Sequence, residues 1–423
     1  MKIRNIVFIL YLFLVQYGNT QSFEEVNPSD VGFIEERLSR IDSIITKSIN
    51  NGEIPGAVAL VARNGKIAYY KSFGYADVEA QKKIGKNSIF RIASMTKAIT
   101  TVGVMVLHER GHFMLNDPIS KYIPEFEKPM ILVEIDSLGN VVKTDSSKKE
   151  IRIIDLLTHS SGLSYPFIKN DLQKVYKDAG IIDGVTAEEI ILESQMKLLA
   201  TLPVLFEPGS KFQYGLSIDL LGYLCEVISG KSFDRFLNDE IFLPLKMHDT
   251  HFYVPNQERD RLVTLYSWID GKGLTVSKGD ESTIKLDNPN YPIDGASSYF
   301  SGGAGLSSTA YDYGRFIQML LNNGELEEAR IISRKSVELM RRSRIDWDND
   351  GRPEFGFGFY VINDIAKEGE LGSDGSYSWG GAFYTSYWID PQENLIGVFM
   401  SQLRPSQTDV SKKFRSLVYQ ALE

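Results

Sequence analysis

The sequence lacks the features that mark several special classes of protein. Cysteine occurs once in 423 residues, which excludes a disulfide-stabilised scaffold. Basic residues are not in excess: 46 Lys and Arg stand against 55 Asp and Glu, and the net charge of −9 argues against a nucleic-acid partner. Internal repeats and low-complexity linkers are also missing. The length therefore corresponds to about two to four ordinary domains, or to one large enzyme fold.

The longest apolar run near the N-terminus is too short to cross a membrane. It covers residues 6–15, follows Lys2 and Arg4, and is succeeded by a polar stretch. A span needs about 20 apolar residues, whereas this pattern is typical of a cleaved secretory signal. We expect residues 1–20 to be that signal and the mature protein to be periplasmic or extracellular, with a retained anchor as the alternative. Cys225 lies in an apolar helical pattern, which predicts a buried, inert thiol.

The pattern of elements predicts an α+β fold. Residues 57–62 and 67–73 read as strands joined by Asn64-Gly65, a strong hairpin signal. Strands at both ends of the chain suggest one sheet built from residues of roughly 21–100 and 300–423, with a mostly helical part at roughly 101–299 inserted between them. Helices are expected at 34–50, 95–110, 186–199, 218–229, 233–241, 309–322, 333–341 and from 407, and further strands at 130–143 (a hairpin), 355–362, 382–390 and 395–401.

One metalloprotease signal is rejected on its context. His108-Glu109-Arg110-Gly111-His112 matches H-E-x-x-H, which requires both histidines on one face of a helix. The glycine predicts that the helix ends before the second histidine, so we expect no metal site there.

A serine nucleophile is the remaining route to hydrolytic chemistry. The G-x-S-x-G elbow is absent, which leaves Ser-x-x-Lys, whose two side chains share one helix face. The lysine serves as a base only when its amine is neutral, and burial favours that form. Polar or mid-helix surroundings argue against three of the four pairs, whereas Ser94 opens an apolar helix that would bury Lys97. The four pairs are Ser94/Lys97, Ser146/Lys149, Ser194/Lys197 and Ser282/Lys285.

Ser94-Met95-Thr96-Lys97 in this setting resembles the serine β-lactamase and penicillin-binding-protein superfamily. The similarity is to its class C β-lactamase-like branch, and within that branch to the family VIII carboxylesterases. It implies a β-lactamase-like serine hydrolase fold with an antiparallel sheet flanked by helices. Further stretches that resemble the branch run through most of the chain, at residues 156–163 (Leu-Leu-Thr-His-Ser-Ser-Gly-Leu), 207–214, 241–247 and 301–309.

The resemblance implies roles for particular residues. Ser94 would be the nucleophile, Lys97 its general-base partner and Tyr214 the tyrosine that shuttles protons. Trp379-Gly380-Gly381 resembles the W-G-G form of the third motif, and the oxyanion hole would be the N–H groups of Ser94 and Ala382.

This sequence departs from the family pattern at two of its motifs. Leu216 stands where Y-x-N has Asn, and K-T-G is absent. Trp379 in place of that lysine removes a cation that would pair with a substrate carboxylate and favours a neutral acyl group.

The expected function is cleavage of small carboxylic esters through an acyl-enzyme, without metal or organic cofactor. The alternatives are an amide hydrolase acting on a β-lactam or a D-amino-acid peptide, and a catalytically silent binding or scaffold relative. We expect small-molecule substrates, no nucleic acid and no stable membrane insertion after signal cleavage. His159 is expected to fix a loop by hydrogen bonding. Five aromatic residues are candidates for the pocket or for ordinary core and surface: Tyr165, Phe167, Phe300, Tyr377 and Tyr384.

Overall fold

A nine-stranded antiparallel sheet combines the two ends of the chain in this computed structural model, which describes residues 22–278, 291–348 and 350–423. The expected signal at residues 1–20 and the pair Ser282/Lys285 lie outside the described residues. β17 pairs with β1, with Val58 opposite Met400, so the C-terminal segment completes the sheet as predicted. In sheet order the strands are β12 (Ile345–Asp346), β13 (Pro353–Phe355), β14 (Tyr360–Val361), β15 (Tyr377–Gly381), β16 (Thr385–Asp390), β17 (Leu395–Met400), β1 (Gly56–Arg63), β2 (Lys66–Asp77) and β3 (Lys82–Lys83).

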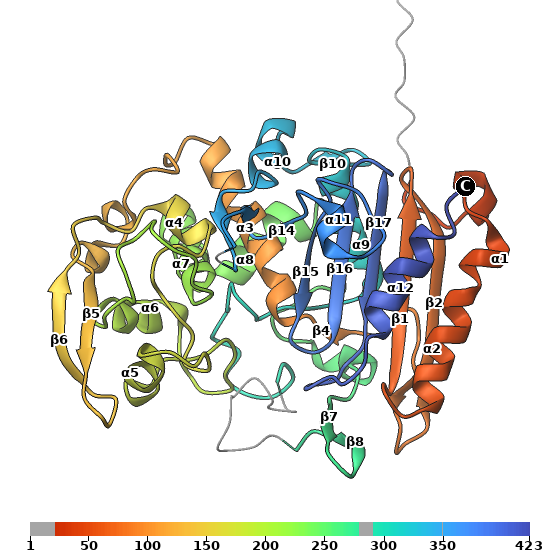
Figure 1. Cartoon of the computed structure of the whole chain (residues 1–423), viewed down its shortest axis with the longest axis horizontal. Helices are drawn as coiled ribbons and strands as arrows, with labels where there is room; N and C mark the ends of the chain where they lie inside the picture. The colour runs from red at the N-terminus through yellow and green to blue at the C-terminus, as the bar shows by residue number, and fades with distance from the viewer. Residues whose placement is uncertain (1–21, 279–290, 349) are drawn as a thin grey trace, which may run out of the picture.

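Helices cover both faces of this sheet (Figure 1). β1 is buried on both sides, because alternate residues of a strand point to opposite faces. Ala59 packs in one core with α2 (Arg40–Asn50) and α12 (Val410–Tyr419), and Leu60 packs in the other core with α9 (Ala310–Leu321). The β1–β2 turn has positive φ at Asn64 (53°) and Gly65 (75°), as the hairpin signal requires.

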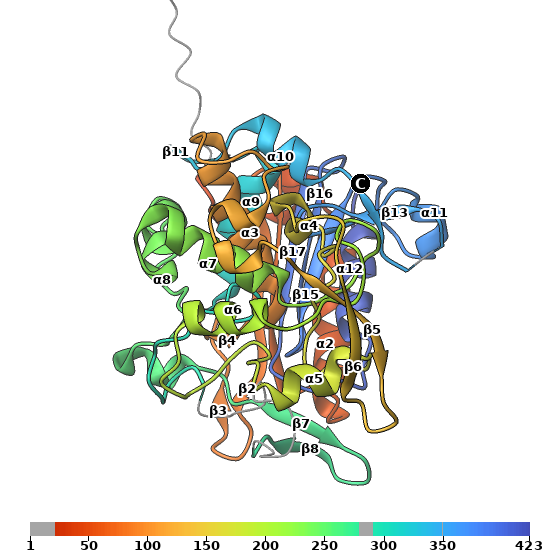
Figure 2. The same cartoon turned by 90° about the vertical axis from the view of Figure 1, so that its left-hand side faces the viewer.

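A mostly helical region lies beside the sheet in Figure 1 and faces the viewer in Figure 2. At its centre α3 (Thr96–Glu109) packs against α7 (Ser217–Ser229). All of α3 from Thr96 to Leu107 is buried, which explains its almost continuous apolar sequence. The other elements of this region are α4 (Ile153–Leu157), α5 (Leu172–Asp178), α6 (Leu192–Ala200), α8 (Phe233–Leu237), the β5–β6 hairpin (Met130–Ile135 and Val141–Ser146) and the β7–β8 hairpin (Tyr266–Ile269 and Gly273–Val276).

Short elements connect these layers. They include the 3₁₀ turn η2 (Ala93–Met95), α1 (Glu35–Leu38), α10 (Arg334–Met340), α11 (Ile365–Glu368), the β4–β9 pair (Phe90–Arg91 and Ser307–Ser308) and the β10–β11 pair (Glu325–Leu326 and Ala329–Arg330). Cys225 is fully buried, as predicted. Within the three described ranges, the structure has no helix that is both long and apolar enough to span a membrane.

Three sequence expectations about element boundaries were wrong. Residues 355–362 form no single strand, because the chain turns between β13 and β14 at Gly358, whose φ is 77°. The strand expected at 382–390 begins only at Thr385, after a turn in which Tyr384 has φ 65°. The helix expected from residue 186 begins at Leu192, because the Thr186 hydroxyl accepts the N–H of Glu188 and holds a local turn instead.

Candidate active site

Ser94 lies in the turn η2, immediately before the first residue of α3. The preceding residue, Ala93, has φ 41°, in the left-handed region that a residue with a Cβ rarely adopts. Ala93 and Met95 are buried, whereas Ser94 is partly exposed. The turn therefore presents the hydroxyl outward at the positive end of the α3 dipole, where developing negative charge is favoured.

Lys97 is the second residue of α3, three residues after Ser94, and is only 1% exposed. Its Nζ donates to Ser94 Oγ at 3.3 Å and to the carbonyl oxygen of Gly303 at 2.7 Å. The amine also lies 4.5 Å from the centre of the Tyr214 ring and 5.3 Å from that of Tyr165. The lysine is thus enclosed beside the hydroxyl, out of bulk water.

Tyr214 reaches the same hydroxyl from the loop before α7. Its OH donates to Ser94 Oγ at 2.8 Å, so amine and phenol converge on one oxygen atom. The buried ring of His159 lies 4.8 Å from the Tyr214 ring. His159 accepts the N–H of Gly215 at Nδ1 (3.4 Å) and that of Gln213 at its carbonyl (2.7 Å).

His159 is a neutral support rather than a proton carrier. Burial, with the charge of Lys97, holds its pKa well below 6.5. Its backbone and ring hold the residues on both sides of Tyr214, in agreement with the loop-fixing part expected from the sequence.

Asp219 on α7 holds Gly303, whose carbonyl oxygen accepts a hydrogen bond from Lys97. Asp219 was not identified from the sequence. It is fully buried and accepts hydrogen bonds from Ser301 Oγ (2.5 Å), the Gly303 N–H (3.1 Å) and the Tyr165 OH (3.4 Å). Burial raises its pKa, while the charge of Lys97 acts in the opposite direction. The available signal was a carboxylate among apolar residues, in Ile218-Asp219-Leu220-Leu221, because a buried charge needs partners.

The third-motif segment lies beside the nucleophile. β15 packs against η2, and Gly381 is so close to Ile92 that an added Cβ would lie 2.3 Å from the Ile92 carbonyl oxygen. Trp379 has its ring 5.8 Å from that of Tyr214. Gly380 is exposed, and Ala382 is the exposed first residue after the strand.

Further aromatic rings extend from Trp379. The ring centres of Phe355 and Trp347 lie 5.4 Å and 5.1 Å from that of Trp379. The ring centre of Phe212 lies 5.0 Å from that of Trp347. Trp347, Phe355 and Phe212 were not identified from the sequence. We call these four residues, Trp379, Trp347, Phe355 and Phe212, the aromatic wall.

Comparison with known proteins decides the family. A family model described as Beta-lactamase matches residues 41–421, most of the chain. The chain belongs to the beta-lactamase family. Protein Rv1367c of Mycobacterium tuberculosis is 32% identical over 368 residues, which are 84% of this chain and 87% of that protein. Esterase EstB of Burkholderia gladioli is 30% identical over 362 residues, which are 83% and 87% of the two chains.

A solved structure of similar fold is also found. EstCE1, described as a hydrolase with promiscuous acyltransferase activity, has a TM-score of 0.80 and 27% identity, and the match covers 91% of this chain and 99% of EstCE1. The sequence resemblance and the β-lactamase-like α+β fold are thereby confirmed, and this member of the beta-lactamase family is a serine hydrolase.

The alternative catalytic signals lack comparable surroundings in this beta-lactamase-family structure. Lys197 points to the surface and pairs with Glu193 at 2.7 Å, and Ser146 and Lys149 are exposed. α3 ends at Glu109, so His112 lies outside the helix as predicted.

The other aromatic candidates divide between site and core. Tyr165 lies beside Lys97, and Phe167 stacks on it at 4.8 Å. Tyr377 is buried against Phe359, and the Tyr384 OH donates to the Thr408 carbonyl at 2.9 Å. Tyr377 therefore belongs to the core, and the partly buried Tyr384 packs against it.

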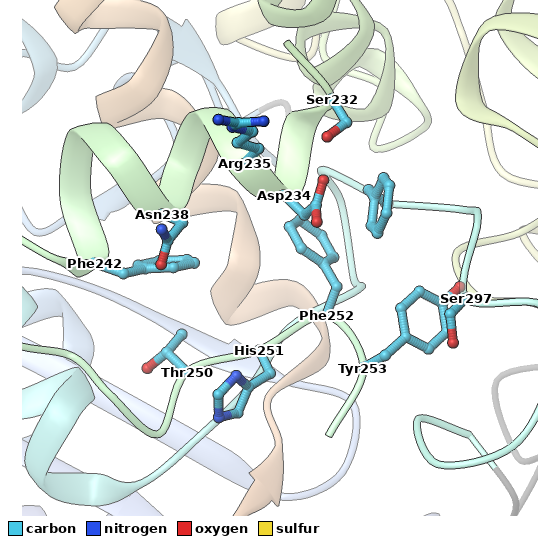
Figure 3. A pocket seen from close by; sticks show the side chains of 11 residues that line it. Ser232, Asp234, Arg235, Asn238, Phe242, Thr250, His251, Phe252, Tyr253 and Ser297 are labelled. Atoms are coloured by element: carbon cyan, nitrogen blue, oxygen red, sulfur yellow. The ribbon is translucent and has the colours of Figure 1, made fainter. Parts of the chain in front are cut away.

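Phe300 lines a separate cavity of about 490 Å³ (Figure 3). Ser94, Lys97 and Tyr214 are not among the residues that line it. Its other lining residues are Ser232, Asp234, Arg235, Asn238, Phe242, Thr250, His251, Phe252, Tyr253 and Ser297.

Proposed function

We propose that this protein hydrolyses small carboxylic esters through an acyl-enzyme on Ser94. The observation that carries the proposal is the convergence of a buried amine and a phenol on one partly exposed hydroxyl, with Lys97 Nζ at 3.3 Å and Tyr214 OH at 2.8 Å. Groups placed in this way can take the proton from the hydroxyl as it attacks and return it to the leaving alcohol.

The chemical steps follow from this arrangement. Ser94 Oγ bonds to the ester carbonyl carbon, and its proton passes through Tyr214 and Lys97 to the alkoxide that leaves. A water molecule then attacks the acyl-enzyme, giving its proton back along the same route and releasing the acid. The N–H groups of Ser94 and Ala382 would stabilise the negative oxygen in both steps.

The aromatic wall supports an ester over a β-lactam or D-amino-acid peptide as substrate. An indole at position 379 offers no charge to a substrate carboxylate, and the neighbouring rings of Trp347 and Phe355 favour an apolar acyl or alcohol group. The similarity to EstB, which is named as an esterase, points in the same direction.

The decisive experiment combines turnover with detection of the covalent intermediate. We expect the wild-type protein to hydrolyse short-chain p-nitrophenyl esters and to gain the acyl mass, and Ser94→Ala to do neither. Ser194→Ala, from the other helical Ser-x-x-Lys pair, is the matched control and should behave as the wild type. Ester turnover that survives in Ser94→Ala would refute the proposal.

The two alternatives predict different results in the same assays. Rapid turnover of a chromogenic cephalosporin with poor ester cleavage would favour the amide hydrolase. The absence of any covalent adduct with esters, lactams and D-peptides would favour a silent binding protein.

Acyl transfer to an alcohol is a second candidate activity, favoured by the description of EstCE1. An acyl-enzyme that admits an alcohol in place of water would form a new ester. Partition between acid and ester product in the presence of a short alcohol measures this activity directly.

We further propose export, with removal of residues 1–20. N-terminal sequencing of the protein recovered outside the cytoplasm should begin near residue 21, and an intact N-terminus on cytoplasmic protein would refute it.

A further inference from the structure

The cavity of about 490 Å³ beside Phe300 is large enough to hold a small molecule (Figure 3). Three segments line it: α8 with the residues that follow it to Phe242, residues 250–253, and residues 297–300. Its volume falls within the range of about 300–1,000 Å³ that is usual for small-molecule sites. The groups that act on an ester at Ser94 do not line this cavity, so its own side chains decide which ligand it suits.

One side of the cavity is aromatic. The ring centres of Phe252 and Phe300 lie 5.4 Å apart, and that of Tyr253 lies 6.0 Å from that of Phe300. The Tyr253 OH donates to the Tyr299 carbonyl oxygen at 3.0 Å, which fixes the direction of its ring. Phe252 is buried, whereas Tyr253 and Phe300 are only partly buried. This side therefore offers ring surface to an apolar group of a ligand, and the negative faces of the rings also attract a cation.

Asp234 on α8 brings an unpartnered carboxylate to the cavity. Its Oδ1 atom is buried and accepts no hydrogen bond, and neither of its oxygen atoms forms an ion pair with any residue that the structure describes. A neighbouring hollow shares Ser232 and Phe300 with the cavity and adds the carboxyl of Glu226, whose pKa burial and the charge of Asp234 raise to about 7. A carboxylate removed from water without a partner is costly, so a cation at this place would be stabilised.

Arg235, the next residue of α8, brings the opposite charge to the same cavity. Its exposed guanidinium forms no hydrogen bond or ion pair within the described part of the chain. The nearby Asp239 is already paired with Lys231 at 2.8 Å, and this bond, with the weaker effect of the Arg235 charge, lowers the pKa of Asp239. Asp234 and Arg235 do not pair with each other, because adjacent residues of a helix point about 100° apart. The cavity thus offers a ligand a negative and a positive group separately.

The other polar groups of the lining are neutral. Burial lowers the pKa of His251, although the charge of Glu258 acts in the opposite direction, so the imidazole is uncharged near neutral pH. Its Nε2 atom is buried without a hydrogen bond and lies 3.5 Å from the Glu258 carboxylate. The Thr250 hydroxyl shares a hydrogen bond with that of Ser308 at 2.8 Å. The lining therefore carries one charge of each sign.

We propose that this cavity binds an apolar amino acid as its zwitterion. The ammonium group would pair with Asp234 beside the rings of Phe252 and Phe300, and the carboxylate would pair with Arg235. The apolar side chain would lie on the aromatic side. A neutral polyol would leave both charges of the cavity unpaired, and a simple amine or acid would leave one. A molecule with both charges and an apolar group uses every part of the lining.

The cavity is joined to the reaction site through one glycine-rich segment. An added Cβ at Gly305 would lie 2.7 Å from Phe252 Cδ1, so the ring packs directly on that glycine. Two residues earlier in the chain, the Gly303 carbonyl oxygen accepts the hydrogen bond from Lys97 at 2.7 Å. A ligand on Phe252 and Phe300 would therefore contact residues on both sides of the segment that supports Lys97.

Calorimetric titration of the full-length protein with L-phenylalanine tests the proposal. We expect saturable heat with Kd below about 1 mM. Phenylalanine amide lacks the carboxylate and N-acetylphenylalanine lacks the ammonium group, so each should bind at least about tenfold more weakly through the loss of one charge-assisted hydrogen bond. Glycine keeps both charges and lacks the apolar group, so it should also bind more weakly than phenylalanine.

Variants of the two charged residues provide the second arm of the test. Asp234→Asn and Arg235→Gln should each weaken phenylalanine binding at least about tenfold, with the fold checked by circular dichroism. The controls Asp178→Asn on α5 and Arg334→Gln on α10 change exposed charges that pair within their own helices, and they should bind as the wild type does.

Three results would overturn the proposal. They are the absence of saturable heat up to about ten times the expected Kd, equal binding of phenylalanine and either analogue that lacks a charge, and unchanged binding in the folded Asp234→Asn and Arg235→Gln variants. Because none of these measurements depends on ester turnover, the result stands apart from the proposed hydrolase activity.

Discussion

Replacement of Gly381 by alanine tests whether β15 must lie directly against the turn that carries Ser94. An added Cβ at this position would lie 2.3 Å from both the Ile92 carbonyl oxygen and Thr385 Oγ1. Ordinary van der Waals contact begins at 3.4 Å, so the strand and the turn must separate by about 1 Å. One of the obstructing atoms is backbone and cannot rotate away.

The size of the effect follows from that displacement. A misplacement of about 1 Å at reacting groups costs about 10²-fold in rate. That factor corresponds to about 2.7 kcal/mol of transition-state stabilisation. The overpacking itself should lower the free energy of unfolding by about 1–3 kcal/mol, which leaves a well-folded protein to assay.

Gly380 in the same motif is the matched control. Among the described residues, an added Cβ there meets only the Thr385 carbonyl oxygen, at 3.3 Å, which a shift of a few tenths of an ångström relieves. We therefore expect kcat/KM for a p-nitrophenyl ester to fall about 10²-fold in Gly381→Ala and less than about threefold in Gly380→Ala. Equal values of kcat/KM in the two variants, with both folded by circular dichroism, would refute this view of the third motif.

Three further predictions address other groups of the site. Lys97→Met removes the amine at Ser94 and should slow acylation about 10²–10⁴-fold by intact mass, whereas Lys197→Met should not; equal rates would contradict the assignment. Because the folded-state pKa of His159 is depressed, only the unfolded chain takes up its proton as the pH falls below about 6.5, and native stability is lost in that range. Between pH 7 and 5.5, the free energy of unfolding measured in urea should fall by about 1.3 kcal/mol more in the wild type than in His159→Asn. Equal decreases in the two proteins would contradict the depressed pKa of His159. Trp379→Lys should lower kcat/KM for neutral esters and raise it for esters bearing a free carboxylate. If the ratio of these two kcat/KM values does not change, the charge of residue 379 does not select the substrate.

The sequence was most informative where the chemistry is local. Ser94 and Lys97 are three residues apart on one helix, so their proximity follows from helical geometry. The apolar sequence of α3 predicted that Lys97 is buried. Asn64-Gly65 predicted its hairpin for the same reason, because the turn depends on the backbone freedom of adjacent residues.

The predicted boundaries of strands were wrong where a turn interrupts an apolar stretch. The β13–β14 hairpin and the turn before β16 both fall inside runs that read as single strands. Apolar periodicity reports which residues are buried, and it does not show where the chain reverses between buried segments. Positive φ at Gly358 and Tyr384 makes these reversals, and only the first had a glycine to indicate it.

The sequence alone predicted the Ser94/Lys97 pair as the reactive groups, and it indicated the sheet shared by both chain ends and the family. Tertiary structure alone decided what surrounds the pair: Asp219 and Gly303 behind Lys97, His159 behind Tyr214, and Trp347 on the aromatic wall. These contacts join residues tens to hundreds of positions apart. Their geometry is set by how α3, α7 and β15 pack around one another, and no local pattern of residues encodes that packing.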